Sequence, residues 1–228
     1  YSFWSSVIDD TDNLCKLISS AKINMEEWCF HRYVISNPSE FTKLEIGFSA
    51  FFLNRTNRSG ILKAGVIGGK AQSGKWKMDV RFNRCDLISR IENIANYNQR
   101  IVVTNLDALD FLDALNFMDS VGKADKNKTL LYLDPPYYIK GQGLYRNFYE
   151  HDDHVLVMKK LRGINFPKWL VSYDNAKEIK DIYSGFPQVE YSLQYTAQQK
   201  KSGEEVMIFS PRMAIPDTLK GVSMPISA

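Results

Sequence analysis

The chain has 228 residues, a hydrophobic fraction of 44% and a formal net charge of +3. This length allows one domain, or one domain with an insertion, and neither the apolar runs nor the start at Tyr1–Trp4 has the pattern of a membrane span or a signal peptide. The cysteines Cys15, Cys29 and Cys85 give no zinc spacing and no disulfide framework, so we expect a cytoplasmic protein in a reducing compartment.

Positive charge is concentrated in one segment. Residues 54–90 hold nine Lys/Arg and two Asp/Glu, a local charge of +7, whereas the rest of the chain carries 20 basic and 24 acidic residues. A basic segment on an otherwise slightly acidic protein is typical of a contact with nucleic acid. A solvated loop that happens to be basic is the alternative.

The first half of the chain is predicted to be helical. Apolar residues recur at helical spacing over 3–18, with a polar break, and then over 25–35, 43–53 and 86–97. Residues 54–84 contain five glycines and little periodicity, so we expect a long loop or a small hairpin insertion there.

From residue 100 onward, strands alternate with helices. We predict strands at 100–104, 129–133 and 169–172, helices at 107–118, 152–162 and 176–183, and a closing hairpin formed by 189–195 and 205–209. This order implies an α/β fold with a mostly parallel sheet that ends in an antiparallel hairpin. We therefore divide the chain into a helical part (1–53), an insertion (54–99), an α/β core (100–211) and a tail (212–228).

The tetrapeptide Asp134-Pro135-Pro136-Tyr137 follows an apolar strand. Since proline fixes φ and lacks an N–H, the strand ladder cannot continue through the pair, and the acid is left at the carboxyl end of the strand, where open α/β sheets bind ligands. The carboxylate and the Pro135 carbonyl are hydrogen-bond acceptors, and the ring of Tyr137 offers a flat aromatic surface. This set suits a planar group with an exocyclic amine. A strand that simply ends in a proline turn is the alternative.

Several further stretches accompany this tetrapeptide in a fixed order. They are Phe51–Gly60 (FFLNRTNRSG), Asn105-Leu106-Asp107 after the predicted strand, Leu144–Tyr149 (LYRNFY), Ser172-Tyr173-Asp174 and Glu205–Ile208 (EVMI). Together they resemble the Dam-like class of DNA adenine-N6 methyltransferases, from Tyr1 to about Pro211.

The resemblance implies a Rossmann-like methyltransferase fold with a small DNA-recognition insertion of helix and loop. It implies S-adenosylmethionine as methyl donor, no metal, double-stranded DNA as partner, and it admits a cognate restriction enzyme. The target would be N6 of an adenine flipped out of the duplex, because a stacked base cannot reach such a pocket.

Residue roles follow from this resemblance. Asp134, Pro135, Pro136 and Tyr137 would form the catalytic site, with Asp134 and the Pro135 carbonyl bonding the target amine and Tyr137 stacking on the base. The aromatic residues 145–149 either close over the base or pack in the core. The cofactor would contact Asp134, Leu106 and Asp107, unless Asp107 only caps a helix. The candidate DNA contacts are Arg55, Arg58, Lys70, Lys75, Lys77, Arg81 and Arg84.

The chain departs from the class at its start. The class carries a Phe-x-Gly-x-Gly-like cofactor loop after its first strand, and the chain shown begins after that point, so we expect an N-terminally incomplete fold with a gap beside the 129–133 strand. The alternative function is a catalytically inactive, methyltransferase-like DNA-binding module.

Two other patterns resemble known binding motifs, but we do not expect either to bind a ligand. Residues 69–75 fit the first seven places of a P-loop, but Trp76 replaces the residue that would bind Mg²⁺. His151-Asp152-Asp153-His154 resembles a metal cluster, but we expect Asp152 or Asp153 to cap the following helix and both histidines to lie at the surface.

Overall fold

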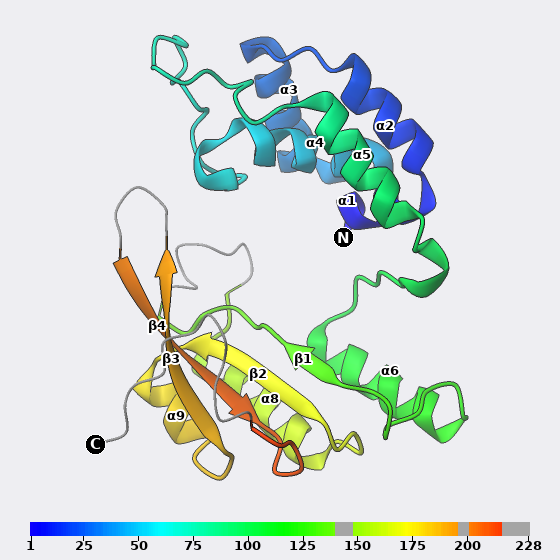
Figure 1. The fold of residues 1–228 in the computed structure, drawn as a ribbon, viewed down its shortest axis with the longest axis vertical. Coiled ribbons are helices and arrows are strands. Elements are labelled where there is room, and N and C mark those ends of the chain that lie inside the picture. Colours follow the sequence, from blue (N-terminus) through cyan, green and yellow to red (C-terminus); the bar gives the residue numbers. More distant parts are fainter. Residues whose placement is uncertain (140–147, 196–200, 216–228) are drawn as a thin grey trace. The chain divides into compact units, whose positions relative to one another are not determined.

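The computed structural model describes residues 1–139, 148–195 and 201–215, without the side chains of 193–195 and 201–203. The chain forms two compact units, residues 1–105 and 106–228 (Figure 1). Each has its own hydrophobic cluster, and the two clusters share no residue.

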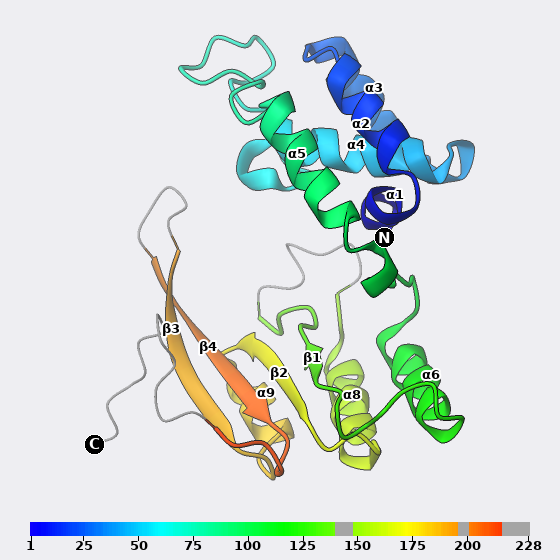
Figure 2. The ribbon, with the colours of Figure 1, turned by 45° about the vertical axis from the view of Figure 1, so that its right-hand side comes forward.

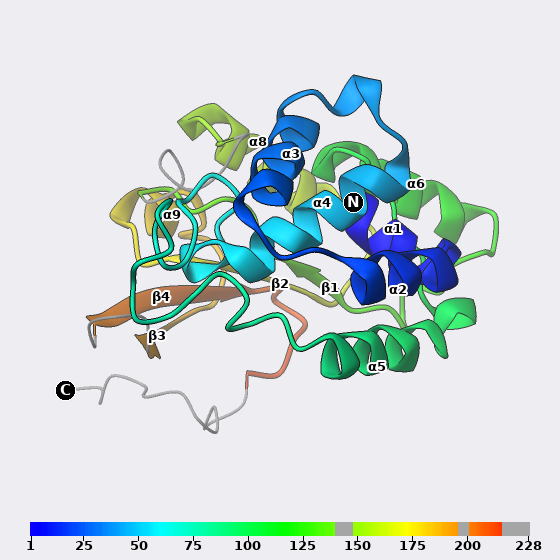
Figure 3. The same ribbon diagram turned by 90° about the horizontal axis from the view of Figure 1, so that it is seen from above.

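The first unit is helical. Its elements are α1 (Ser2–Asp9), α2 (Thr11–Ser20), α3 (Met25–Ser36), η1 (Pro38–Glu40), α4 (Lys43–Thr56), η2 (Arg58–Gly60), α5 (Arg84–Ala95) and η3 (Asn98–Arg100). Helices α1, α2 and α5 pack against one another within this unit (Figure 3). All four helical stretches predicted from the apolar spacing are confirmed.

Helix α4 is central to this unit because α1 and α3 both pack on it. Its start is fixed by a capping box, in which Thr42 accepts from the Glu45 N–H and Glu45 accepts from the Thr42 N–H. At Gly47 a Cβ atom would lie 2.7 Å from the backbone oxygen of Ser2. The absence of a side chain at Gly47 therefore lets α1 approach α4 closely.

Residues 61–83 contain no regular helix or strand, as expected. Asn57, which is fully buried, organises the start of this segment: its side-chain oxygen accepts from Trp28 Nε1 at 2.7 Å, and its amide donates to the carbonyls of Ile61 and Leu62 at 3.0 Å. Gln72 organises the rest, donating to the Ile67 carbonyl at 2.7 Å and accepting from the Met78 N–H at 3.0 Å. The segment is thus an irregular loop with a well-bonded framework.

The second unit is a four-stranded sheet with helices. Its elements are α6 (Ala108–Ser120), β1 (Leu131–Leu133), α8 (His151–Gly163), β2 (Trp169–Asp174), α9 (Lys177–Ile182), β3 (Gln188–Tyr195) and β4 (Lys201–Phe209). The strand order is β1-β2-β4-β3 (Figure 2). Only β1 and β2 pair in parallel among the described strands, whereas β2–β4 and β3–β4 are antiparallel. The α/β class and the closing hairpin are confirmed, but the prediction of a mostly parallel sheet is wrong for the described strands.

The two faces of this sheet differ in character. Leu131, Val171, Tyr173, Val206 and Ile208 belong to a hydrophobic cluster that also includes buried residues of α6, α8 and α9. Since side chains alternate along a strand, the residues between them point to the opposite face. That second face carries the polar residues Tyr132, Ser172, Asp174 and Glu205.

The predicted strand at 100–104 is not present. Residues 98–100 form η3, residues 101–107 have no regular structure, and the side chain of Val102 is 89% exposed. A strand needs a neighbour to satisfy its backbone hydrogen bonds, and no described segment pairs with this one. The segment instead joins the two units.

The described contacts also bear on the division of the chain. Helix α5, assigned from the sequence to the 54–99 insertion, packs on α1 and α2. Residues 1–53 and 54–99 therefore belong to one compact unit. A division at residue 54 is a functional distinction within that unit, and it stays a proposal.

Candidate active site

The candidate site lies at the carboxyl end of β1, where the chain leaves the sheet at Asp134. Asp134 is exposed, and its Oδ1 accepts a hydrogen bond from Ser172 Oγ on β2 at 2.9 Å. The same hydroxyl lies 2.9 Å from the hydroxyl of Tyr132. The parallel pairing of β1 with β2 brings Ser172 to this place, 38 residues further along the chain. The carboxylate is therefore oriented through one oxygen.

Asp174, two residues beyond Ser172, holds the backbone after the prolines. Its two carboxylate oxygens accept from the N–H groups of Tyr138 and Ile139, at 2.8 and 2.9 Å. The Asp174 side chain is only 3% exposed. Two charge-assisted bonds to consecutive amides fix the path of the loop, which proline alone would only divert from the sheet.

A third contact reaches the aromatic residue of the tetrapeptide. The hydroxyl of Tyr137 donates to Glu205 Oε1 at 2.8 Å, and the hydroxyl of Tyr191 donates to Glu205 Oε2 at 2.6 Å. Glu205 lies on β4, directly opposite Asp174 of β2. Asp174 of β2 and Glu205 of β4, which are paired, thus hold the loop after β1 at different residues.

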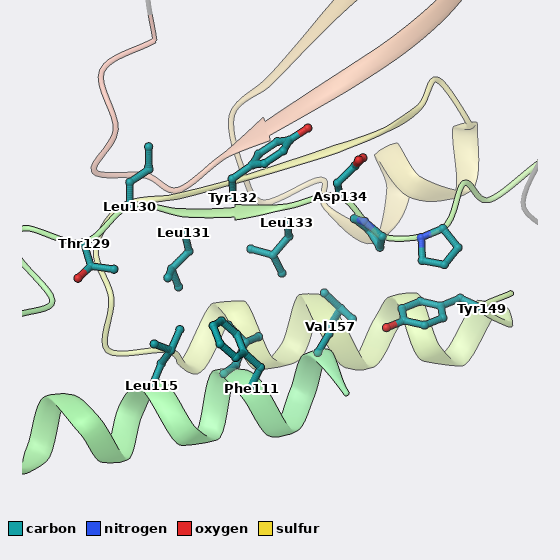
Figure 4. Close-up of a pocket in the computed structure, with 14 residues that line it drawn as sticks. Phe111, Leu115, Thr129, Leu130, Leu131, Tyr132, Leu133, Asp134, Tyr149 and Val157 are labelled. Atoms are coloured by element: carbon teal, nitrogen blue, oxygen red, sulfur yellow. The ribbon is translucent and has the colours of Figure 1, made fainter. Parts of the chain in front are cut away.

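A pocket of about 580 Å³ extends along β1 on the opposite face. Leu131 and Leu133 point from the strand toward Phe111 of α6 and Val157 of α8, whereas Asp134 points the other way (Figure 4). The pocket is open and mainly apolar, and its volume is within the range of small-molecule sites. β1 is an edge strand of the described sheet, and the pocket lies on the face of this strand that is turned toward α6 and α8 (Figure 4).

The other two residues expected at the cofactor are not part of this pocket. Asp107 caps α6, its Oδ1 accepting from the Leu109 N–H at 2.9 Å, which agrees with the helix-cap alternative. Leu106 is half exposed beside it. Asp134, by contrast, lies at one end of the pocket lining.

A comparison with protein families identifies the chain. The family model of D12 class N6 adenine-specific DNA methyltransferases matches residues 1–197, which include candidate residues of both units. The chain belongs to this family. A search of curated proteins found no match.

Membership establishes the reaction class. The methyltransferase transfers a methyl group from S-adenosylmethionine to N6 of adenine in DNA. No helix in the described part of the chain has the length and apolar character needed to cross a membrane. Within the same residues, no group of three His, Cys, Asp or Glu side chains is arranged to hold a metal ion.

The seven basic residues expected to contact DNA differ in their surroundings. Arg58, Lys70, Lys75 and Lys77 are exposed, the last bonding the Gln72 carbonyl. None of the seven forms an ion pair with an acid among the described residues; they are Arg55, Arg58, Lys70, Lys75, Lys77, Arg81 and Arg84.

Arg81 and Arg84 also serve the fold, and Arg55 lies among like charges. Arg81 donates to the carbonyls of Asn54 and Asn57 at 2.7 and 2.6 Å, so it completes the end of α4. Arg84 donates to the carbonyl of Ala21 at 2.6 Å. Burial lowers the pKa of Arg55, and the positive charges of Arg81 and Arg90 lower it further. Arg55 thus stands among like charges.

His154 corrects one sequence expectation. It is fully buried, not at the surface, and its Nδ1 lies 3.0 Å from the Tyr173 hydroxyl. Burial lowers its pKa, so the ring is neutral at pH 7. The cap predicted at Asp152 or Asp153 lies instead at Glu150, the N-cap of α8. Asp153 takes part as the third helical residue of a capping box, accepting from the Glu150 N–H at 2.8 Å.

The aromatic stretch 145–149 lies mostly outside the described residues. Within them, Tyr149 is half-buried, lines the pocket and packs its ring 5.3 Å from that of His154. This contact agrees with the core-packing interpretation for that one ring.

Sequence reasoning missed the residues that hold the loop after β1, residues 134–139. Ser172, Asp174 and Glu205 stand in stretches that carried the family resemblance, but no role was assigned to them. The available signal was the alternation of polar with apolar residues in β2, where Ser172 and Asp174 flank Tyr173. That pattern places both on one face of a strand.

Proposed function

We propose that Asp134 and the carbonyl of Pro135 accept the two hydrogens of the target amine while Tyr137 stacks on the flipped adenine. The observation that carries this assignment is the orientation of Asp134. Ser172 occupies Oδ1 from the sheet side, and the side chain is exposed at the end of β1. The carboxylate is thereby pre-oriented for an incoming donor.

The chemistry needs such acceptors because the N6 lone pair of adenine is delocalised into the ring. Two acceptors on the amine hydrogens favour a more tetrahedral nitrogen and so free the lone pair for attack. Acceptors aimed at charge that develops in the transition state give the largest stabilisation when they are already oriented. The bonds from Ser172 to Asp134 and from the loop backbone to Asp174 support that orientation.

The methyl donor fits the residues present. S-adenosylmethionine supplies a methyl group already activated on a positively charged sulfur. The pocket beside β1 offers apolar walls from Phe111, Leu131 and Leu133, and Asp134 borders one end of it. Apolar walls suit the planar ring system of the donor, whereas the Asp134 carboxylate points to the other face of the strand, toward Ser172 (Figure 4). Leu106 and Asp107 stay candidates for cofactor contacts from the start of α6.

The first unit is proposed to contact the DNA backbone. Arg58, Lys70, Lys75 and Lys77 are exposed and form no ion pair with a described acid, and Arg55 stands among like charges that a phosphate would relieve. Arg81 and Arg84 support the same surface from within, because their guanidinium groups bond backbone carbonyls. The bonded framework of Asn57 and Gln72 keeps the loop in one conformation.

The fold of the second unit and the cysteines agree with this function. The parallel β1–β2 pair, with its site at the carboxyl end of β1, supports a Rossmann-like arrangement. Three free cysteines agree with a reducing cytoplasm. A cognate restriction enzyme is a partner that a sequence-specific methyltransferase can have.

The decisive experiment compares Asp134→Ala with the matched control Asp181→Ala, an exposed acid on α9. Transfer of tritium from S-adenosylmethionine to unmethylated duplex DNA measures turnover, and a nitrocellulose-filter assay measures DNA affinity. We expect Asp134→Ala to lower the rate by about 10²–10³-fold while DNA affinity stays within a few-fold. Wild-type turnover in Asp134→Ala would refute the assignment, and DNA binding without turnover in the unmodified chain would favour the inactive DNA-binding module.

A further inference from the structure

Glu205 is a buried carboxylate with a phenol on each oxygen. It is 5% exposed and accepts from Tyr137 at Oε1 and from Tyr191 at Oε2. Burying a carboxylate is costly unless hydrogen bonds compensate it. These bonds compensate the burial of the carboxylate, and one of them comes from Tyr137, the aromatic residue of the candidate tetrapeptide.

The register of the sheet explains why Glu205 reaches Tyr137. Glu205 lies opposite Asp174 on β2 and opposite Tyr191 on β3. Residues that face each other across antiparallel strands point to the same side, which is the polar face that also holds Ser172. Glu205 thus reaches Tyr137, 68 residues earlier in the chain, from an inner strand of the sheet.

The remaining backbone of the loop is already fixed by other contacts. Asp174 holds the amides of Tyr138 and Ile139, and Ser172 holds Asp134. The side chain of Tyr137 keeps two rotatable bonds after its backbone is fixed. The hydroxyl bond to Glu205 restrains both of them, so it sets the plane of the ring.

We propose that Glu205 is a positioning residue that orients the ring of Tyr137 for stacking on the target base. This inference rests on the proposed function, in which Tyr137 stacks on the flipped adenine. Stacking on an aromatic side chain depends on the ring's plane and offset. A ring that rotates freely holds the base in several orientations, and the methyl group then meets a misaligned nitrogen more often.

A double-mutant cycle in the full chain tests the proposal. The variants are Tyr137→Phe, which keeps the ring and removes the bond, Glu205→Ala, and the two together. Glu205→Gln retains one acceptor and one donor for the two phenols, and Glu190→Gln is the matched control on the neighbouring strand β3. The readouts are kcat and KM, the thermal unfolding midpoint, and the fluorescence of 2-aminopurine at the target position, once sequencing of the methylated product has identified the target.

The expected pattern is non-additive. Tyr137→Phe and Glu205→Ala each lower kcat about tenfold and change the 2-aminopurine signal in the same way. The kcat of the double variant is no lower than that of the less active single variant. Glu205→Gln retains kcat within about threefold of the unmodified chain, and Glu190→Gln matches it. A role in stability alone would instead lower the unfolding midpoint and leave kcat and the fluorescence of the folded protein unchanged.

Three outcomes overturn the proposal. They are unmodified kcat and fluorescence in Tyr137→Phe, additive losses in the double variant, and a loss of kcat in Glu190→Gln as large as the loss in Tyr137→Phe. Tyr137→Phe leaves Glu205 in place, so it decides the matter even if Glu205→Ala fails to fold. An unmodified chain that transfers no methyl group would overturn the proposed function itself, whereas an active chain with an unaffected Tyr137→Phe variant overturns only this inference.

Discussion

At the scale of single residues, a buried histidine makes the stability of the helical unit depend on pH. His31 is 4% exposed, and its Nδ1 lies 2.9 Å from Ser49 Oγ. Burial lowers its pKa from the ordinary value of 6.5 to about 4. The unfolded chain therefore binds a proton below pH 6.5 that the folded unit does not, and stability falls as the pH decreases from 6.5 to 4.

This shift predicts an acid-sensitive helical unit. The loss from His31 should approach about 3 kcal/mol near pH 4, reduced by the carboxylate of Glu27, which lies 3.7 Å from Nε2. Urea unfolding at pH 7, 5.5 and 4, followed by the fluorescence of buried Trp28, measures it. His31→Gln should be less stable at pH 7 but lose less on acidification, and parallel losses in both proteins would contradict the assignment.

Single residues also mark the limit of what the sequence could predict at the site. Asp134 and Tyr137 were identifiable because the two prolines beside them force the chain out of its strand. Ser172 and Glu205 were not, because their role depends on pairings between residues 38 and 68 positions apart. Such pairings follow from strand register, which local spacing does not determine.

At the scale of elements, the 61–83 loop combines a fixed framework with exposed charge. Replacing Lys70, Lys75 and Lys77 together by Ala should flatten the dependence of log affinity for DNA on log salt, by about 0.9 for each phosphate that the variant no longer neutralises. Titration of fluorescent duplex DNA at several salt concentrations measures the slope. A matched triple variant at Lys123, Lys159 and Lys177, exposed lysines of the other unit, should keep the original slope. Equal slopes for the two triple variants would show that the loop lysines are merely solvated.

Helices and strands were not equally predictable. A helix satisfies its own backbone, so apolar spacing sufficed for α3, α4 and α5 to within a few residues. A strand depends on a partner, and residues 100–104 have the composition of a strand but no neighbour in the described sheet. The same dependence on partners made the sheet less parallel than the alternating order of elements indicated.

At the scale of the whole molecule, the two separate hydrophobic clusters predict that a core substitution in one unit destabilises that unit alone. Gly47→Ala should destabilise the first unit, because the new Cβ would lie 2.7 Å from the Ser2 oxygen. Ile179→Ala should destabilise the second by about 2–5 kcal/mol, since Ile179 is fully buried. Hydrogen exchange resolved by peptide should show faster exchange in residues 1–105 for the first variant and in residues 106–228 for the second. Faster exchange in both units for either variant would show that the two cores unfold together.

The alternation along β2 has a consequence for how this sequence can change. Val171 and Tyr173 belong to the hydrophobic cluster under the helices, whereas Ser172 and Asp174, which alternate with them, hold the loop that follows β1. Insertion or deletion of one residue in the strand would exchange the two sets, placing a carboxylate among aliphatic side chains and a valine where the loop needs an acceptor. One strand thus supplies both the hydrophobic core and the residues that hold the loop, and a shift by one residue would disrupt both at once.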